Sequence, residues 1–395
     1  MEIEFEYVKD YKENGFGFLS RTFKKRLLRM TNRMIADDYK LSQKELSALY
    51  EDGYIGPFEP VLSETEIDDL SKKLLTHSRD KEDKHPLYRR FSVRDWYLVY
   101  PNLIRFASHP QVLSQLNSIM GNDLLLWRSH NFYKPPGGTP VGWHQDFGTF
   151  SGEDIGNNKP SLLPTHLKHI SEDTLRRYLP ETLQLSHSDL APDQSDFWNI
   201  TVWVALTDIS ADMGVMRFLK GSHKRRYPVR MGSLTESDFW QSPFANIHNK
   251  EQLINACNDS QLVLDVDTSQ VLNNVNLNAY SYEELKQIIL LKLQEKQGSI
   301  TVSDEVKEEQ IVTFPMKKGS YIIFSERTLH GSLANTSDKE RLAINFRITK
   351  SSTLVYPFRL RGEYFDGFNL DIRHHQSVLL SGKNLNPYNA IMAME

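Results

Sequence analysis

The sequence predicts a mainly β protein with flanking helices, built around two sheets that pack face to face as a jelly roll. Short segments rich in β-branched and aromatic residues recur from Leu124 onward, and turn residues separate them. Segments with helical spacing precede them in the chain. Two packed sheets leave a mouth between them, where side chains from distant strands can converge.

The composition fits a soluble globular enzyme, with 39% hydrophobic and 25% charged residues in a chain of 395. The net charge of −4 gives no reason to expect nucleic-acid or membrane partners. No apolar run reaches the ~18 residues that a membrane span needs, and the acidic start of the chain is unlike a secretory signal. The single cysteine, Cys257, excludes an internal disulfide and any multi-cysteine metal site. We therefore expect a cytoplasmic protein.

The N-terminal region, residues 1–123, is expected to be helical and to pack on the core. Residues 23–39 carry apolar side chains near helical spacing among many basic ones, which predicts an amphipathic helix. Ser42 and Ser63 each stand three positions before a glutamate, the spacing of a capping box, so a helix should follow each serine. A further helix is expected over Ser108–Met120.

The core is expected to comprise residues 124–224 and 311–350. Its clearest strand is Asn199–Asp208, whose alternation places Trp203 on one face and Val202 on the other. Residues 225–310 interrupt the β pattern with polar and helix-like sequence, and they are too long for a hairpin connection. We interpret them as an insertion that could act as a lid over the mouth of the site.

The remaining residues, 351–395, form a C-terminal extension with few structural signals. His374 and His375 lie within it and could bind metal adventitiously, but we expect them in a solvated tail.

A candidate metal site begins at His144 and Asp146. On an extended strand, alternate side chains share a face, so this imidazole and this carboxylate can bind one cation. A lone His-x-Asp is weak evidence, and a third ligand is needed. His330 is the best candidate far downstream. Two histidines and one carboxylate form the facial triad of non-haem iron(II) oxygenases, which leaves coordination positions open. Our hypothesis is iron(II) bound by these three residues.

A candidate site for a dicarboxylic acid lies beside the third ligand. Ser332 follows His330, and Arg341 lies on the next expected strand. An arginine can hold a carboxylate through two parallel hydrogen bonds, and a serine hydroxyl adds another donor. The pair suits the distal carboxylate of 2-oxoglutarate, whose other end would chelate the iron. Alone, Arg341 would be read as part of a salt bridge at the surface or at a sheet edge.

Several motifs, in order, resemble the phytanoyl-CoA dioxygenase family of iron(II)/2-oxoglutarate oxygenases. They are Trp143–Asp146, Val202–Asp208, Gly214–His223 and Leu329–Ser332, together with Arg341. Within that family, Trp127–Gly138 and Ile200–Trp203 look most similar to halogenases that chlorinate carrier-tethered amino acids.

The resemblance implies a double-stranded β-helix core, with iron at His144, Asp146 and His330 and 2-oxoglutarate at Arg341 and Ser332. Asn131 stands where the similar ectoine hydroxylase contacts the co-substrate, so it is a weaker candidate for the same role. Trp203 is expected to wall the site beside the co-substrate, together with three further aromatic residues, Trp143, Phe147 and Phe150.

The identity of residue 146 bears on the reaction. The similar halogenases have Ala or Gly at this position, which opens a coordination position for chloride, whereas Asp146 fills it here. We therefore expect O2-dependent hydroxylation of an unactivated carbon. Desaturation or cyclisation from the same cofactors remains open, because the metal ligands alone do not fix the outcome.

The expected substrate is a small molecule, an amino acid or a carrier-tethered acyl group of a biosynthetic pathway. The basic run Lys220–Arg226 could meet an acidic carrier protein, although most charge runs are simply solvated. Two functions of other classes stay open. A zinc hydrolase could use the same three ligands to activate water, and a non-catalytic binding protein could keep the fold without turnover.

Overall fold

A computed structural model describes most of the chain. The described residues are 39–80, 84–146, 159–165, 177, 197–233, 244, 247–259, 262, 268–294, 297–302, 306–366 and 370–392. The helix expected at residues 23–39 lies outside them except for its last residue, and Phe147 and Phe150 also lie outside them.

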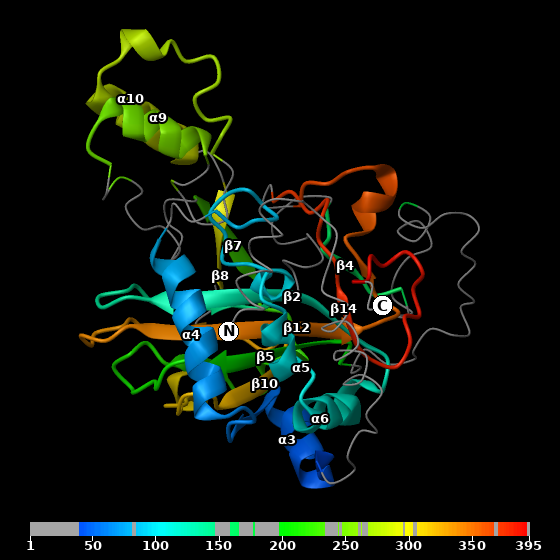
Figure 1. The fold of residues 1–395 in the computed structure, drawn as a ribbon. Helices are drawn as coiled ribbons and strands as arrows, with labels where there is room; N and C mark the ends of the chain where they lie inside the picture. The colour runs from blue at the N-terminus through cyan, green and yellow to red at the C-terminus, as the bar shows by residue number, and fades with distance from the viewer. Residues whose placement is uncertain are drawn as a thin grey trace.

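Two antiparallel sheets form the core and confirm the predicted jelly-roll class (Figure 1). The larger sheet has the order β1 (Tyr54–Phe58), β10 (Tyr321–Ser325), β5 (Asn199–Ala205), β12 (Arg341–Lys350), β2 (Leu124–Lys134) and β14 (Val378–Ser381). The smaller sheet has the order β3 (Val141–His144), β11 (His330–Ser332), β6 (Met216–Leu219) and β9 (Ile311–Thr313). Two short pairs lie outside these sheets, β13 (Leu354–Val355) with β4 (Leu162–Leu163) and β7 (Val229–Ser233) with β8 (Gln297–Val302).

Helices cover the outer face of the larger sheet. The α-helices of the body are α3 (Gln43–Asp52), α4 (Glu64–Arg79), α5 (Ile104–Ala107) and α6 (Pro110–Met120). Short 3₁₀ turns are η2 (Trp96–Leu98), η3 (Pro101–Leu103), η5 (Ser222–Lys224), η7 (Leu277–Ala279), η8 (Glu308–Gln310) and η9 (Pro357–Arg361). In Figure 1, α4 and α5 run across the strands of this sheet.

The N-terminal ends of the helices lie at or next to the positions predicted from the capping residues in the sequence. Ser42 and Ser63 both form complete capping boxes, because each hydroxyl accepts from the N–H of the glutamate three positions on and that glutamate returns a bond to the serine N–H. The third start differs from the prediction by one residue. His109, rather than Ser108, caps α6, since its Nδ1 accepts from the Gln111 N–H.

Alternate side chains of β5 belong to two different hydrophobic cores, one on each face of the larger sheet. Val202 and Val204 join the cluster that packs beneath the helices, where Phe106 of α5 stacks on Phe346 of β12 with ring centroids 5.7 Å apart. Trp203 points the other way, into the cluster between the two sheets. The predicted faces of this strand are therefore confirmed, and the inner face is the one that meets the smaller sheet.

The pairing of β12 with β2 shows which side chains lie on the inner face of the larger sheet. Four residues of β12 alternate onto it, and each has a partner on β2. The pairs are Arg341 with Lys134, Ala343 with Phe132, Asn345 with His130, and Arg347 with Arg128. Three of the four pairs therefore place polar or charged groups on the face between the sheets, and the pair of Ala343 with Phe132 is apolar.

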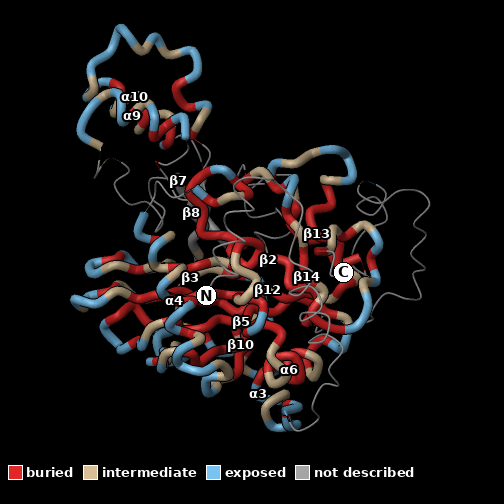
Figure 2. Tube along the Cα trace, viewed as in Figure 1, coloured by how far each residue is buried: buried red, intermediate tan, exposed pale blue. Residues whose placement is uncertain are grey.

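A small helical lobe stands apart from the body (Figures 1 and 2). It contains α9 (Lys250–Asn258) and α10 (Tyr282–Gln294) around its own apolar cluster, which includes the buried Cys257. The β7–β8 pair leads toward it, and β8 lies against β3, the strand that ends at His144. The lobe falls within the segment that we interpreted as an insertion.

Strands from outside the expected core range complete the larger sheet. β1 comes from the N-terminal region and β14 from the C-terminal extension. The expectation of a solvated tail was wrong for His375, which is buried and whose Nε2 lies 2.7 Å from the carbonyl of Trp127. Its neighbour His374 is exposed. Among the helices that the structure describes, none combines the length and the apolar character needed to cross a membrane.

Candidate active site

The three candidate metal ligands meet on the smaller sheet. His144 at the end of β3 and His330 at the start of β11 are partners across the two strands, and their ring centroids are 4.2 Å apart. Asp146 follows β3, and one ligand atom from each of the three residues lies within 4.8 Å of the other two. The structure thus brings together residues separated by almost two hundred positions.

Both imidazoles are oriented by the same kind of contact, a hydrogen bond to the backbone carbonyl two residues earlier. The Nδ1 atom of His144 lies 2.9 Å from the carbonyl of Gly142, and that of His330 lies 2.8 Å from the carbonyl of Thr328. Because an Nδ1–H must donate to these carbonyls, each Nε2 keeps its lone pair for a metal. Burial lowers the pKa of His330 to about 3, so its neutral, ligating form prevails near neutral pH. This donor set fits a divalent iron ion.

Asp146 is held by an arginine from the opposite sheet. The Arg347 Nη2 atom lies 3.2 Å from Asp146 Oδ2, and both side chains are largely buried. Burial alone would raise the pKa of Asp146, but the Arg347 guanidinium, with the two imidazoles, keeps it below the ordinary value. The carboxylate is therefore ionised and fixed in direction before any metal binds.

Gln145, between the two ligands of the motif, fixes the metal strand to the loop after β6. Its Nε2 donates to the carbonyls of Arg225 and Arg327 at 2.9 and 2.5 Å, and its Oε1 accepts from the N–H of Tyr227. Ser222 acts similarly on the other ligand strand, because its hydroxyl accepts from the Leu329 N–H at 2.8 Å. These two polar side chains position the segments that carry all three ligands.

Arg341 is a buried cation without an acidic partner among the described residues. It is 2% exposed, its Nη1 donates to the Gly214 carbonyl at 2.6 Å, and its Nε has no partner in that part of the chain. Burial is the cause that lowers its pKa to about 10. The guanidinium lies over the Trp203 ring, 5.6 Å from its centroid. A buried charge of this kind needs an anionic ligand, so the site fits a carboxylate of 2-oxoglutarate.

A second cation, Lys134, lies beside Arg341. Its Nζ donates to the Ser332 hydroxyl at 2.9 Å and to the Leu333 carbonyl at 2.6 Å. The ammonium occupies a lone pair of Ser332, which leaves the hydroxyl proton free to donate to a bound carboxylate. Space for the lysine stem exists because residue 138 is glycine, where a Cβ would lie 2.5 Å from Lys134 Cγ.

Among the described candidates, Trp143 is not brought to the site, because it alternates with His144 on β3 and packs against Leu219, Tyr227 and Leu329. Nor is Asn131 brought to the site. Its partner on β12 is Ile344, which belongs to the cluster beneath the helices, whereas His130 and Phe132 stack together on the inner face. The amide is buried, and neither its oxygen nor its nitrogen has a partner among the described residues. Alternation along β2 therefore turns it away from the candidate co-substrate site.

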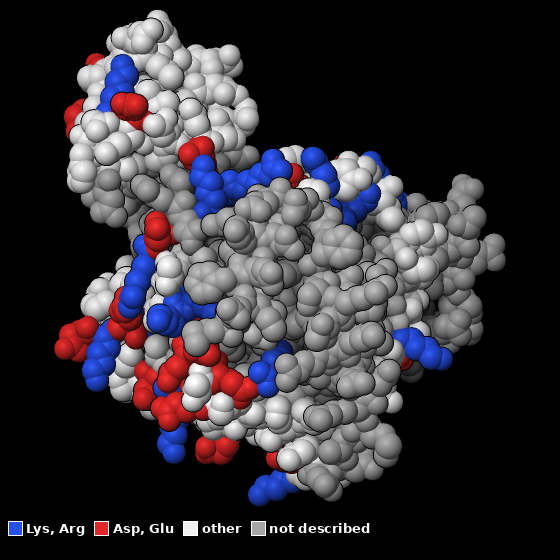
Figure 3. Space-filling view, in the orientation of Figure 1, with Lys and Arg blue, Asp and Glu red and all other residues white. Residues whose placement is uncertain are grey.

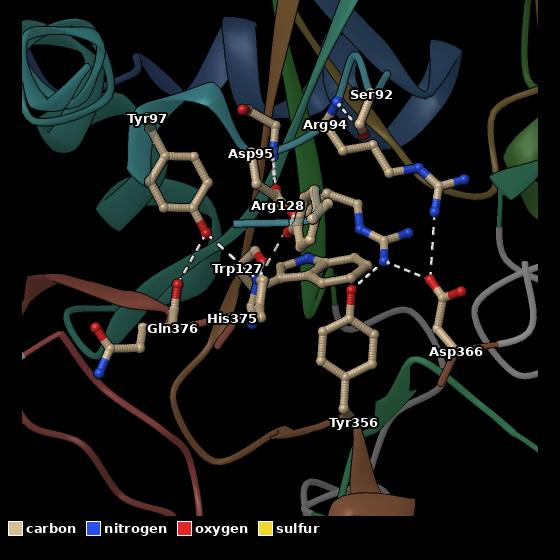
Figure 4. Close-up of polar contacts among 12 residues, drawn as sticks. Ser92, Arg94, Asp95, Tyr97, Trp127, Arg128, Tyr356, Asp366, His375 and Gln376 are labelled. Carbon is tan, nitrogen blue, oxygen red and sulfur yellow. Dashed lines mark hydrogen bonds and ion pairs between the residues drawn. The ribbon is translucent and has the colours of Figure 1, made fainter. Parts of the chain in front are cut away.

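At one end of the inner face lies a buried polar network (Figure 4). Arg94 and Arg128 both point at Asp366, and each places a guanidinium nitrogen 3.2 Å from the same oxygen, Oδ2. Arg128 also donates to the hydroxyl of Tyr356. The network joins β2 to the C-terminal extension at the end of the sheet that carries Arg347.

The surface charges are mixed in sign (Figure 3). In this view, acidic side chains gather over α4, and Lys and Arg lie along the boundary between the lobe and the body. The basic run identified in the sequence is partly neutralised, because Lys220 pairs with Asp52 and Lys224 with Glu51, both on α3.

Sequence reasoning missed Lys134, Arg347, Asn345 and His130. A signal for two of them was present, since Asn345 and Arg347 follow Arg341 at even spacing and must share its face if the segment is a strand. Lys134 and His130 could be found only by knowing which strand pairs with which.

One protein-family model matches part of the chain. Residues 190–343 match the family model described as Phytanoyl-CoA dioxygenase (PhyH), which confirms the resemblance drawn from the sequence motifs. The matched segment contains His330 and Arg341, and His144 and Asp146 precede it. The class of protein that fold and site define is an iron(II)- and 2-oxoglutarate-dependent oxygenase, an enzyme that uses O2.

The similar solved structures have low sequence identity to this chain. CytC3 with Fe(II) and alpha-ketoglutarate is 19% identical over 90% of this chain and 93% of its own, with a TM-score of 0.49. The apo form of the non-heme monooxygenase ThoJ is 16% identical over 88% and 85%, with a TM-score of 0.49. EctD from S. alaskensis with bound Fe is 16% identical over 82% and 83%, with a TM-score of 0.43.

Because these TM-scores are below 0.5, the likeness adds nothing to the geometry described above. Among curated proteins, none matches this chain significantly.

Proposed function

We propose that this oxygenase hydroxylates an unactivated carbon of a small molecule. The observation that carries the proposal is the convergence of His144, Asp146 and His330 between two sheets. Beside them, the buried guanidinium of Arg341 needs an anionic ligand. His144, Asp146 and His330 would hold the iron. Arg341 and Ser332 would hold the distal carboxylate of 2-oxoglutarate, with Trp203 as the wall of that site.

The bound iron and 2-oxoglutarate would supply the oxidising chemistry: 2-oxoglutarate would lose CO2 and take up one atom of O2 to become succinate, and the other oxygen atom would convert a C–H bond of the substrate into C–OH. The protein residues position these groups. Gly142 and Thr328 carbonyls hold the two imidazoles with Nε2 toward the metal. Arg347 directs the carboxylate of Asp146, and Lys134 directs the hydroxyl of Ser332. An iron ion held by these three residues would remain open to 2-oxoglutarate and O2.

Hydroxylation is favoured over halogenation by the carboxylate at residue 146. Asp146 is ionised, buried and oriented by Arg347, so a halide would find its coordination position taken. Asp146→Gly should abolish O2-dependent succinate formation because an iron ligand is lost, and it should admit chloride to the metal. Asp212→Gly, in an exposed turn, serves as the control. Wild-type turnover in Asp146→Gly without added ligand would refute the assignment of Asp146.

The proposed substrate is an amino acid or an acyl group tethered to a carrier protein. Desaturation or cyclisation by the same residues is the alternative outcome. Mass spectrometry of incubations with candidate substrates separates these reactions, since hydroxylation adds one oxygen atom and the alternatives remove two hydrogens. If a carrier docks at Lys220–Arg226, replacing Arg225 and Arg226 with glutamate should raise the KM for the carrier-bound substrate and leave that for a free amino acid unchanged.

Two functions of other classes lead to predictions that differ from those of the oxygenase. A zinc hydrolase on this triad would work without O2 and would not need Arg341. A non-catalytic binding protein would bind iron without consuming 2-oxoglutarate. The buried Arg341 without an acidic partner among the described residues favours the oxygenase over the zinc hydrolase, which would not use this guanidinium. Turnover of 2-oxoglutarate separates the oxygenase from the binding protein.

A further inference from the structure

Three guanidinium groups gather on one side of the candidate metal site. Arg94 and Arg128 approach a single carboxylate oxygen of Asp366, each at 3.2 Å. Arg347 approaches the candidate iron ligand Asp146, also at 3.2 Å. In all three residues the guanidinium Nε is buried and has no hydrogen-bond partner among the described residues.

The strand register places this cluster on the inner face. Arg347 is the β12 partner of Arg128, and Arg94 forms an isolated bridge with His130. Partners across antiparallel strands project to the same side. The three guanidiniums therefore surround the imidazole of His130, and they add to burial in driving its pKa well below the ordinary value.

His130 provides a flat surface at the centre of the cluster. Its ring stacks on that of Phe132 with centroids 4.5 Å apart and planes 9° apart. Both rings are only partly buried, as are His144 and Arg347, whereas Arg94 and Arg128 are buried. Arg347 connects this cluster to the candidate metal site, because its guanidinium lies 3.2 Å from Asp146 Oδ2.

We propose that the substrate carries an anionic oxyacid group, a carboxylate or a phosphate, which binds to Arg94 and Arg347 across the His130 ring. Planar guanidiniums suit both groups, because two N–H donors can bind two oxygens of one anion. The substrate then lies along the stacked rings of His130 and Phe132, with its reacting carbon toward the metal. The inference rests on the proposed function and narrows its substrate class.

The test measures binding rather than turnover. The protein is loaded with Mn(II) and saturating 2-oxoglutarate under argon, so that the site at Arg341 is filled. Propionate, methyl phosphate and the neutral propionamide are then titrated at one ionic strength. We expect at least one anion to bind roughly tenfold more tightly than propionamide, as charge-assisted hydrogen bonds to guanidinium allow. A carboxylate-bearing substrate predicts preference for propionate, and a phosphate-bearing one predicts preference for methyl phosphate.

Arg94→Gln should remove that preference, and Arg105→Gln should retain it. Arg105 is a matched control because it also pairs with a carboxylate, Glu66, but on the exposed surface of α5. If Arg94→Gln fails to fold by circular dichroism, Asp366→Asn replaces it. This variant frees the guanidiniums from their competing carboxylate, so the anion should bind at least as tightly as in the wild type.

Equal binding of the anions and propionamide by the wild type would overturn the inference, as would a preference that survives Arg94→Gln or an anion bound more weakly by Asp366→Asn. Failure of the proposed function would appear earlier, as failure of the Mn(II) protein to bind 2-oxoglutarate. The two failures are therefore distinguishable.

Discussion

The guanidinium of Arg347 lies 3.2 Å from the carboxylate of Asp146, and the two residues come from opposite sheets of the jelly roll. The contact connects the larger sheet to the metal motif on the smaller one. Because one carboxylate oxygen is directed toward the arginine, the other is left for a metal. Partners of this kind orient metal ligands and contribute to metal affinity.

Arg347→Gln should therefore weaken iron binding by about 10-fold to 100-fold, the range typical for loss of an outer partner. The dissociation constant for Fe(II) can be measured under argon by competition with a chromogenic chelator. Arg347→Lys restores the charge but not the planar geometry, so it should recover only part of the affinity. Unchanged iron affinity in Arg347→Gln would show that Asp146 is oriented without the arginine.

Lys134→Met should raise the dissociation constant for 2-oxoglutarate by about tenfold, because a buried cation and the orientation of the Ser332 hydroxyl are lost together. Iron affinity should not change. Lys339→Met is the matched control, since this exposed lysine precedes the same strand, β12. An effect of equal size in both variants would attribute the change to general surface charge instead.

Gln145→Leu should lower the free energy of unfolding by roughly 2–4 kcal/mol, because several buried backbone groups lose their partner at once. Urea unfolding of the metal-free protein measures this effect. Gln287→Leu on the exposed face of α10 is the control and should change little. A Gln145→Leu protein as stable as the wild type would mean that the hydrogen bonds to Arg225, Arg327 and Tyr227 do not hold the metal strand.

Glu326 gives the protein a pH-dependent stability. Burial raises the pKa of its carboxyl to about 7, whereas the unfolded chain has the ordinary value of about 4.3. Between these values the folded protein keeps a proton that the unfolded chain has lost, so this residue reduces stability progressively as pH rises through that window.

Glu326→Gln removes the effect. The stability of the variant relative to the wild type should grow by about 4 kcal/mol between about pH 4.3 and pH 7 and then stay constant. Urea unfolding at several pH values measures the difference, with Glu308→Gln on the surface as the control. A difference that does not vary with pH would show that Glu326 is not protonated in the folded state.

Local signals in the sequence predicted local structure well. The serine–glutamate spacings at Ser42 and Ser63 are capping boxes, and the alternation of β5 gave the right faces, because both depend on neighbours within a few residues. The edge strand β1 was missed because its sequence, Tyr54–Phe58, contains a Gly-Pro pair that is typical of turns.

Contacts across the chain were harder to predict. The meeting of His144 with His330 was correctly expected because the residue types and their chemistry suggested it. Placing Asn131 beside the co-substrate rested on resemblance, and the alternation of β2 puts it on the opposite face. The role of Lys134 depends on which strand pairs with β12, and the sequence does not reveal this pairing.

The most direct test of the central claim is anaerobic titration of the protein with Fe(II) and 2-oxoglutarate, followed by visible absorption. We predict a weak charge-transfer band that saturates at one iron and one 2-oxoglutarate per chain. The band should be lost in His330→Ala, and it should need a much higher 2-oxoglutarate concentration in Arg341→Gln. The absence of the band in the wild type, or a band unaffected by both substitutions, would contradict this prediction.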